Sequence, residues 1–218
     1  MTDKKTLILL ILLMITGTTK IIAEETDTRT WIDLFAVKKI RSATIGLLGE
    51  IYTINHNTSI ERTSIGMKGD YEFFPWLSTG AGYVLLNYNH PGYHELANRF
   101  YFQAEPSWHL SRFIFSLRER VQITLYPTSR SNEVDSYIWR NRFEICYKNE
   151  KIKIEPIISI ESLYLLNHAD TNPLTEFRYT LGTYYHFAKN QKFKFYGMYT
   201  DGTKLNRYIL GVVYEIKL

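Results

Sequence analysis

The chain has little of what usually stabilises a small exported protein or anchors it in a membrane by helices. It contains one cysteine, Cys146, among 218 residues, which excludes an intramolecular disulfide framework and leaves core packing as the expected role of that thiol. Lysine and arginine number 26 against 22 aspartate and glutamate residues, and so balanced a charge indicates neither a nucleic-acid partner nor an acidic substrate. No apolar run is long enough for a transmembrane helix. Stability and any membrane contact are therefore expected to come from the fold itself.

The N-terminal residues have the pattern of a secretory signal. Lysines precede an apolar run at residues 7–15, and Ala23 is followed by two glutamates. That run is too short to span a bilayer as a helix. We predict residues 1–23 as a cleaved signal peptide, with an uncleaved anchor as the alternative, and residues 24–218 as a single domain. No cysteine directly follows the run, so a lipoprotein anchor is unsupported, and a membrane would have to be crossed by strands.

Apolar and polar residues alternate along most of the remaining chain. In residues 175–187, Phe177, Tyr179 and Leu181 share one face of a strand, while Arg178 and Thr180 share the other. Counting from residue 43, ten segments of about nine to fourteen residues repeat this pattern. The fold class predicted is all-β, an antiparallel transmembrane β-barrel. A soluble β-sandwich or lipocalin-like barrel is the competing architecture, since it also alternates.

The connections between these segments favour a bacterial outer-membrane barrel. They are short near residues 75, 110, 149 and 189, and longer or more polar near 94, 130 and 170. Such barrels have short periplasmic turns, longer external loops and an even number of strands, with both chain ends periplasmic. We therefore expect about ten strands, with twelve as the alternative because residues 30–40 are strand-like but hard to place. Tyr, Trp and Phe gather toward strand ends, as an interfacial girdle requires.

Charged residues collect on the polar face as pairs and triplets of opposite sign. They are expected to face the lumen, where they can neutralise one another, and they form the candidate site: Arg118, Arg120, Arg140, Arg142, Glu144, Glu155, Glu161, Glu176 and Arg178. About ten strands leave a lumen mostly filled by side chains, which favours a salt-bridged plug. The alternative is a polar passage or a site for an acidic ligand. Glu119 is the one charge on the apolar face of its segment, which a bulge or a rim position would explain.

Other polar residues give weaker signals of chemistry. His90, His94 and Glu95 have a spacing that could bind a metal on a helix, but they stand beside Pro-Gly in an expected loop. His168 and Asp170, with Ser129 or Ser131, could meet at the external rim, yet no nucleophile-elbow spacing supports a hydrolase. We therefore predict no catalytic residues, no metal and no cofactor.

Several segments together resemble the DUF2490 family. They are Arg-Glu-Arg at 118–120, the Trp-Arg-Asn-Arg-Phe-Glu strand at 139–144, the Glu-Pro…Glu segment at 155–161, Phe-Arg-Tyr-Thr-Leu-Gly…Tyr at 177–185, and Lys-Phe-Lys-Phe-Tyr at 192–196. The resemblance covers nearly all of the exported chain. Residues 31–37 also resemble the first strand of such proteins, which would make eleven or twelve strands. The resemblance implies an uncharacterised bacterial outer-membrane β-barrel and brings no known activity or active site.

The function expected from these features is that of a non-enzymatic barrel in the outer membrane of a Gram-negative cell, with lipids as its partners and no nucleic acid. Its role would be structural, adhesive or the restricted passage of small solutes. Two alternatives are a barrel enzyme acting on lipid or peptide at the external rim, and a soluble periplasmic β-barrel that binds an apolar ligand.

Overall fold

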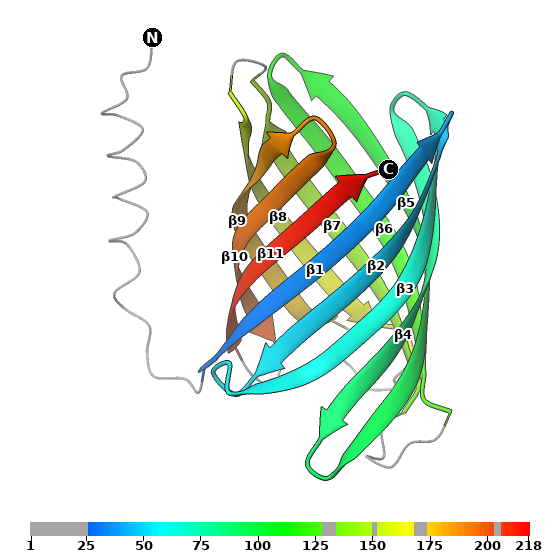
Figure 1. Ribbon diagram of the computed structural model, residues 1–218, viewed down its shortest axis with the longest axis vertical. Coiled ribbons are helices and arrows are strands. Elements are labelled where there is room, and N and C mark those ends of the chain that lie inside the picture. Colours follow the sequence, from blue (N-terminus) through cyan, green and yellow to red (C-terminus); the bar gives the residue numbers. More distant parts are fainter. Residues whose placement is uncertain (1–25, 128–133, 150–151, 168–173, 203–205) are drawn as a thin grey trace, which may run out of the picture.

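The computed structural model describes residues 26–127, 134–149, 152–167, 174–202 and 206–218. These residues form one closed β-barrel of eleven strands (Figure 1). The strands are β1 (Thr26–Ile40), β2 (Ala43–Ile54), β3 (Ser59–Phe74), β4 (Leu77–His90), β5 (Tyr93–Leu110), β6 (Phe113–Leu125), β7 (Ser136–Tyr147), β8 (Ile154–Leu165), β9 (Leu174–Ala188), β10 (Gln191–Gly202) and β11 (Asn206–Lys217). In these ranges no helix is long and apolar enough to cross a membrane. The predicted signal peptide lies outside the described residues.

Each strand pairs antiparallel with the next, and a parallel pair between β1 and β11 closes the barrel. The ten strands predicted from residue 43 onward are all present, and β1 is the eleventh. The expected even count is therefore wrong, and so is the expectation that both ends of the barrel domain lie on one side. β1 begins at the end where β6 stops and β7 starts, whereas β11 stops at the opposite end (Figure 1). We call the latter the two-residue-turn end, because four of its five connections contain two residues; the fifth, expected to be short near residue 149, spans residues 148–153.

The connection near residue 94 also differs from the prediction. Instead of a long polar loop, β4 and β5 continue to a two-residue turn at Pro91-Gly92, where Gly92 has φ 84°. The register runs in an unbroken series to the pair His90↔Tyr93, and this hairpin projects beyond the other strands at the lower end of the barrel in Figure 1. Strand residues that project beyond the barrel wall can be polar on both faces. The polar composition of residues 89–98 therefore indicated a loop, although most of these residues lie in strands.

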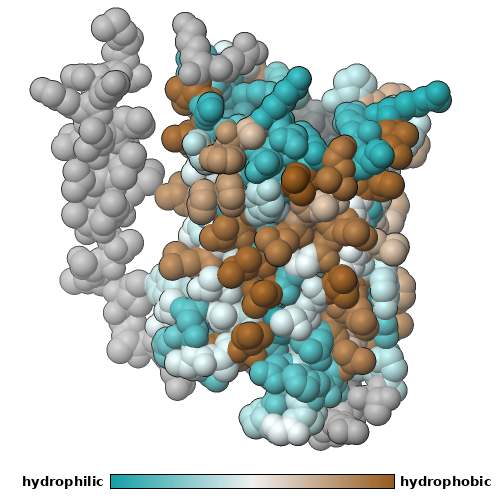
Figure 2. Space-filling model, in the orientation of Figure 1, coloured by the Kyte–Doolittle hydropathy of each residue, from teal (hydrophilic) through white to brown (hydrophobic). Residues whose placement is uncertain are grey.

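The two faces of the wall have the polarity that the alternation predicts. On β9, Leu181 points outward and is 54% exposed, while its neighbour Thr180 lines the interior. The same holds around the barrel, where Ile65 and Leu47 are 66% and 62% exposed on the outer wall. Figure 2 shows apolar side chains forming a band across the middle of one face, with hydrophilic side chains above and below it.

The interior holds a small apolar cluster besides its charges. Leu48, Val84, Leu86 and Ala97, from β2, β4 and β5, are buried against one another. On the opposite side the inward ring of Tyr196 fills the space that a side chain at Gly211 would occupy. Side chains thus fill much of the barrel, and the remaining space is confined to a charged central region.

Candidate functional site: the charged lumen

The interior of the barrel encloses a cavity of about 620 Å³. Its lining includes twelve Lys and Arg side chains but six Asp and Glu side chains. Other inward carboxylates pair within the wall and do not line the cavity, among them Glu144 and Glu176. The accessible space is therefore more basic than the interior as a whole.

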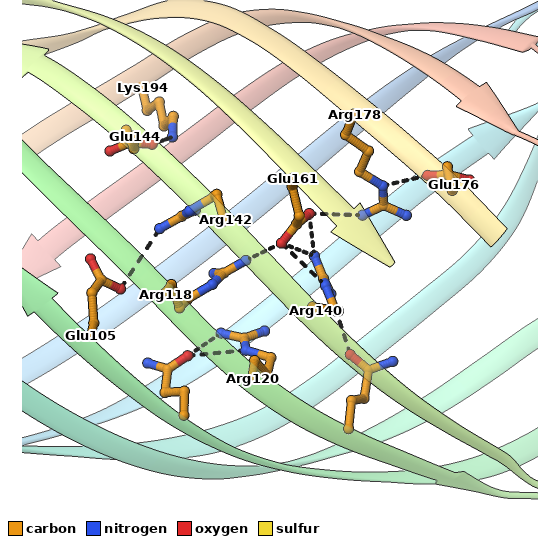
Figure 3. Close-up of polar contacts among 12 residues, drawn as sticks. Glu105, Arg118, Arg120, Arg140, Arg142, Glu144, Glu161, Glu176, Arg178 and Lys194 are labelled. Atoms are coloured by element: carbon orange, nitrogen blue, oxygen red, sulfur yellow. Dashed lines mark hydrogen bonds and ion pairs between the residues drawn. The ribbon is translucent and has the colours of Figure 1, made fainter. Parts of the chain in front are cut away.

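Glu161 on β8 is the centre of the charged network. Arg118 Nη2 donates to Glu161 Oε1 at 2.5 Å, and Arg140 Nη2 donates to both carboxylate oxygens at 3.1 and 2.9 Å. Arg178 Nη1 lies 3.6 Å from Oε2. Figure 3 shows these arginines converging on the carboxylate from β6, β7 and β9. Three guanidinium groups share one carboxylate that is only 6% exposed, so the network is buried and carries a positive excess.

Further ion pairs extend from this centre along the wall. Arg178 Nε donates to Glu176, whose other oxygen accepts a hydrogen bond of 2.9 Å from Arg207 Nη1. Arg178 also lies over the ring of Trp31 on β1, 5.5 Å from its centroid. That contact passes over β10 and β11, which stand between β9 and β1 in the wall. The charged side chains therefore reach across the lumen.

Toward the two-residue-turn end, two carboxylates of the predicted cluster have other partners. Glu144 Oε2 lies 3.3 Å from Lys194 Nζ, and its Oε1 accepts a hydrogen bond of 3.4 Å from the Tyr184 hydroxyl. Glu155 lies 3.1 Å from Nε2 of His186. All nine predicted residues are on the inward side of the wall, but these two carboxylates form separate pairs outside the Glu161 network.

Four arginines on β6 and β7, which we call the arginine square, are cross-strand neighbours. Arg118 is opposite Arg142, and Arg120 is opposite Arg140. Like charges in directly opposed positions repel each other and destabilise the ladder. Arg118 and Arg140 bind Glu161 as described, whereas Arg120 donates to the neutral amide oxygen of Gln103 through Nε and Nη2, at 3.0 and 2.5 Å.

Lumen residues that the sequence reasoning left out of the candidate site lie on β1 to β3. Asp33 and Glu50 are opposed in register, and Arg62 Nη2 donates to Glu50 at 3.1 Å. The ring of Tyr52 stacks on Trp31, with centroids 4.4 Å apart. Alternation within β2 and β3 places these side chains on the polar face, but only the closure of the barrel through β1 shows that they oppose the arginine-rich wall.

The weaker candidates have ordinary structural surroundings. His90 Nε2 lies 3.3 Å from Glu95 in the β4–β5 hairpin, and the described residues contain no group of three or more His, Cys, Asp or Glu side chains that could hold a metal ion. The candidate rim residues Ser129, Ser131, His168 and Asp170 lie outside the described residues.

Glu119 occupies neither a bulge nor a rim, contrary to what was expected. It pairs in regular register with Ala104 and Asn141 near the middle of β6. Its carboxylate accepts a hydrogen bond of 2.8 Å from the indole Nε1 of Trp139 on the outer wall. A neighbouring donor, rather than irregular backbone, therefore accommodates this charge on the apolar face.

Comparison with protein families agrees with the architecture just described. The family model described as "Protein of unknown function (DUF2490)" matches residues 28–207, which extend from β1 to the start of β11. The chain belongs to the DUF2490 family. The match includes β1, so the strand that was hard to place from alternation is part of the DUF2490 domain. No curated protein matches the chain, and the family description assigns no activity to the lumen.

Proposed function

We propose that this DUF2490 protein is a non-enzymatic outer-membrane β-barrel that allows restricted passage of small hydrophilic solutes. The observation that supports the proposal is the distribution of polarity, which is the opposite of that in a soluble protein with an apolar core and a polar surface. Charged side chains line the interior, while large apolar side chains such as Leu47, Ile65 and Leu181 are exposed over the outer wall. In water such a continuous apolar band would drive aggregation, whereas lipid covers it without cost.

The dimensions and aromatic residues of the wall support the same proposal. The strands contain between 12 and 18 residues, and a tilted transmembrane strand needs about 9–11. Aromatic pairs gather at two levels. Phe74–Trp76, Trp108–Phe115 and Phe193–Tyr214 lie toward the two-residue-turn end, while Trp139–Tyr164 and Tyr199–Tyr208 lie toward the other. Aromatic girdles at both interfaces are typical of transmembrane barrels.

The lumen supports a narrow polar passage more than a binding site for an apolar ligand. Its cavity of about 620 Å³ is lined mainly by charged and polar groups, which an apolar ligand would leave unsatisfied. Because the Glu161 network and the Trp31–Arg178 contact occupy part of the cross-section, only small solutes are expected to enter.

Cell fractionation tests the location. The full chain should sediment with outer membranes, resist extraction by alkaline carbonate, and migrate faster in gels before heating than after. Recovery as a soluble periplasmic monomer without detergent would contradict the proposal and favour a soluble barrel.

Reconstitution tests the activity. Liposomes containing the protein should swell in small neutral solutes and exclude larger ones, and the folded protein should show no esterase or protease activity. Swelling no faster than that of empty liposomes with every solute would contradict solute passage. Hydrolytic activity that remains with the purified protein would favour a barrel enzyme.

A further inference from the structure

We infer that the arginine square binds a small oxyanion of the phosphate, sulfate or carboxylate class inside the lumen. The inference rests on the proposed function only in that it names the class of solute expected to enter the same lumen. Figure 3 shows the four guanidinium groups near one another, with Glu105 beside Arg142 and with Glu161 contacting Arg118 and Arg140.

The positive charge of the square is only partly neutralised. Arg118 and Arg140 share Glu161. Arg142 has Glu105 as its nearest carboxylate at 3.8 Å, which is beyond hydrogen-bond distance. Arg120 has no ion pair with any described carboxylate, and its contacts are the neutral Gln103 amide and the face of the Tyr101 ring, 4.2 Å from the centroid. Of the four charges, Arg120 therefore has no counter-ion among the described residues, and Arg142 has only the long ion pair with Glu105.

Two members of the square also carry unused donors. The Nε atoms of Arg118 and Arg142 are buried and have no hydrogen-bond partner among the described residues, as is also true of Arg62 and Arg207 elsewhere in the lumen, but only Arg118 and Arg142 bring two such donors to opposed positions. A buried donor without an acceptor costs free energy that a bound acceptor would recover. Because Arg118 and Arg142 are directly opposed on neighbouring strands, one anion could satisfy both groups and also remove their mutual repulsion.

The chemistry of these groups selects oxyanions. A planar guanidinium presents paired N–H donors that match two oxygens of a phosphate, sulfate or carboxylate. Arg99, which also lines the cavity, donates through Nε to the Thr124 hydroxyl at 3.3 Å and adds a further positive charge on β5. The acidic side chains Asp33 and Glu50 are on the opposite wall, so an anion is drawn toward β5 to β7.

Calorimetric titration of the folded full chain with inorganic phosphate tests the inference. The protein is held in detergent micelles at constant ionic strength, with chloride as the balancing anion. We expect saturable phosphate binding that sulfate displaces and acetate displaces more weakly. Titration heats that do not saturate, or equal binding when chloride replaces phosphate, would overturn the inference.

Three substitutions locate the site. Arg142→Gln should weaken phosphate binding by roughly tenfold or more, because a charge-assisted hydrogen bond is lost. Arg207→Gln is the matched control: it removes a lumen arginine whose Nε also lacks a partner but which lies on β11, outside the arginine square. It leaves Glu176 paired with Arg178 and should not change the affinity. Glu105→Gln should tighten binding severalfold, because it removes the carboxylate that competes for Arg142. Equal loss in Arg142→Gln and Arg207→Gln, or weaker binding in Glu105→Gln, would contradict the assignment.

The design separates this inference from the proposed function. A gain of affinity in Glu105→Gln cannot come from misfolding, so the result stands even where Arg142→Gln fails to fold. Binding in micelles does not depend on where the protein resides in the cell. Phosphate binding by a protein recovered as a soluble periplasmic monomer would support the anion site and refute the membrane location. Recovery in the outer membrane without saturable phosphate binding would support the membrane location and refute the anion site.

Discussion

The outer wall and the lumen should respond differently to the same added charge, and adjacent residues of β9 allow a matched comparison. Leu181 is the central residue of that strand and is 54% exposed on the outside. Leu181→Arg therefore places a guanidinium in the outer apolar band; if this band faces lipid, as we propose, the expected cost is about 2–4 kcal/mol of unfolding free energy. Thr180→Arg introduces the same group one residue away, where it faces the polar cavity.

The cost of Thr180→Arg should be smaller, because Thr180 and the carboxylate of Glu161 line the same polar cavity. Some repulsion from Arg178, the next inward residue on β9, remains. Thr180→Glu should therefore cost less again, since a carboxylate meets a cation-rich lining. Reversible unfolding of the wild type and each variant in lipid vesicles, followed by tryptophan fluorescence, measures these differences. A larger loss for Thr180→Arg than for Leu181→Arg would refute the assignment of faces.

Three further results are expected. Gly211→Ala should cost about 1–3 kcal/mol, because its Cβ would overlap the inward tyrosine ring that fills this space, whereas Gly197→Ala, where no atom lies within 4 Å, should be neutral or stabilising in the same unfolding assay. Glu161→Gln should destabilise the barrel by about 3–5 kcal/mol, since it leaves three arginines without their shared charge, and a loss below about 1 kcal/mol would show that the network contributes little. With the two-residue-turn end facing the periplasm, a cysteine at Asn57, which is at the opposite end, should react with an impermeant thiol reagent on whole cells, while one at Asn190 should not. The reverse labelling would show the opposite orientation.

The ten strands after residue 43 could be predicted because their two faces differ. β1 could not be placed with the same certainty, since its inward face mixes the apolar Trp31 and Phe35 with Asp33, while its outward residues Ile32 and Leu34 are apolar. A strand whose inward face is partly apolar gives a weaker signal at period two. The parallel pairing of β1 with β11 follows from closure, which no local pattern contains.

The sequence predicted which charged side chains face the lumen, but it did not predict which of them form ion pairs with one another. Alternation places Arg118, Arg140 and Glu161 on the polar side, yet their convergence depends on the register of three separate strands. The ends of β4 and β5 were wrongly predicted as a loop, because strands that extend past the barrel rim need no apolar face.

Quenching of single tryptophans by brominated lipids tests most directly whether lipid covers the outer wall. Trp139 is 42% exposed on the outside, whereas Trp31 lines the lumen and stacks on Tyr52. Each is studied in vesicles with the other three tryptophans replaced by phenylalanine. Bromine atoms on the acyl chains should quench the fluorescence of Trp139 strongly and leave that of Trp31 nearly unchanged. Equal quenching of both, or quenching of Trp31 alone, would contradict the account.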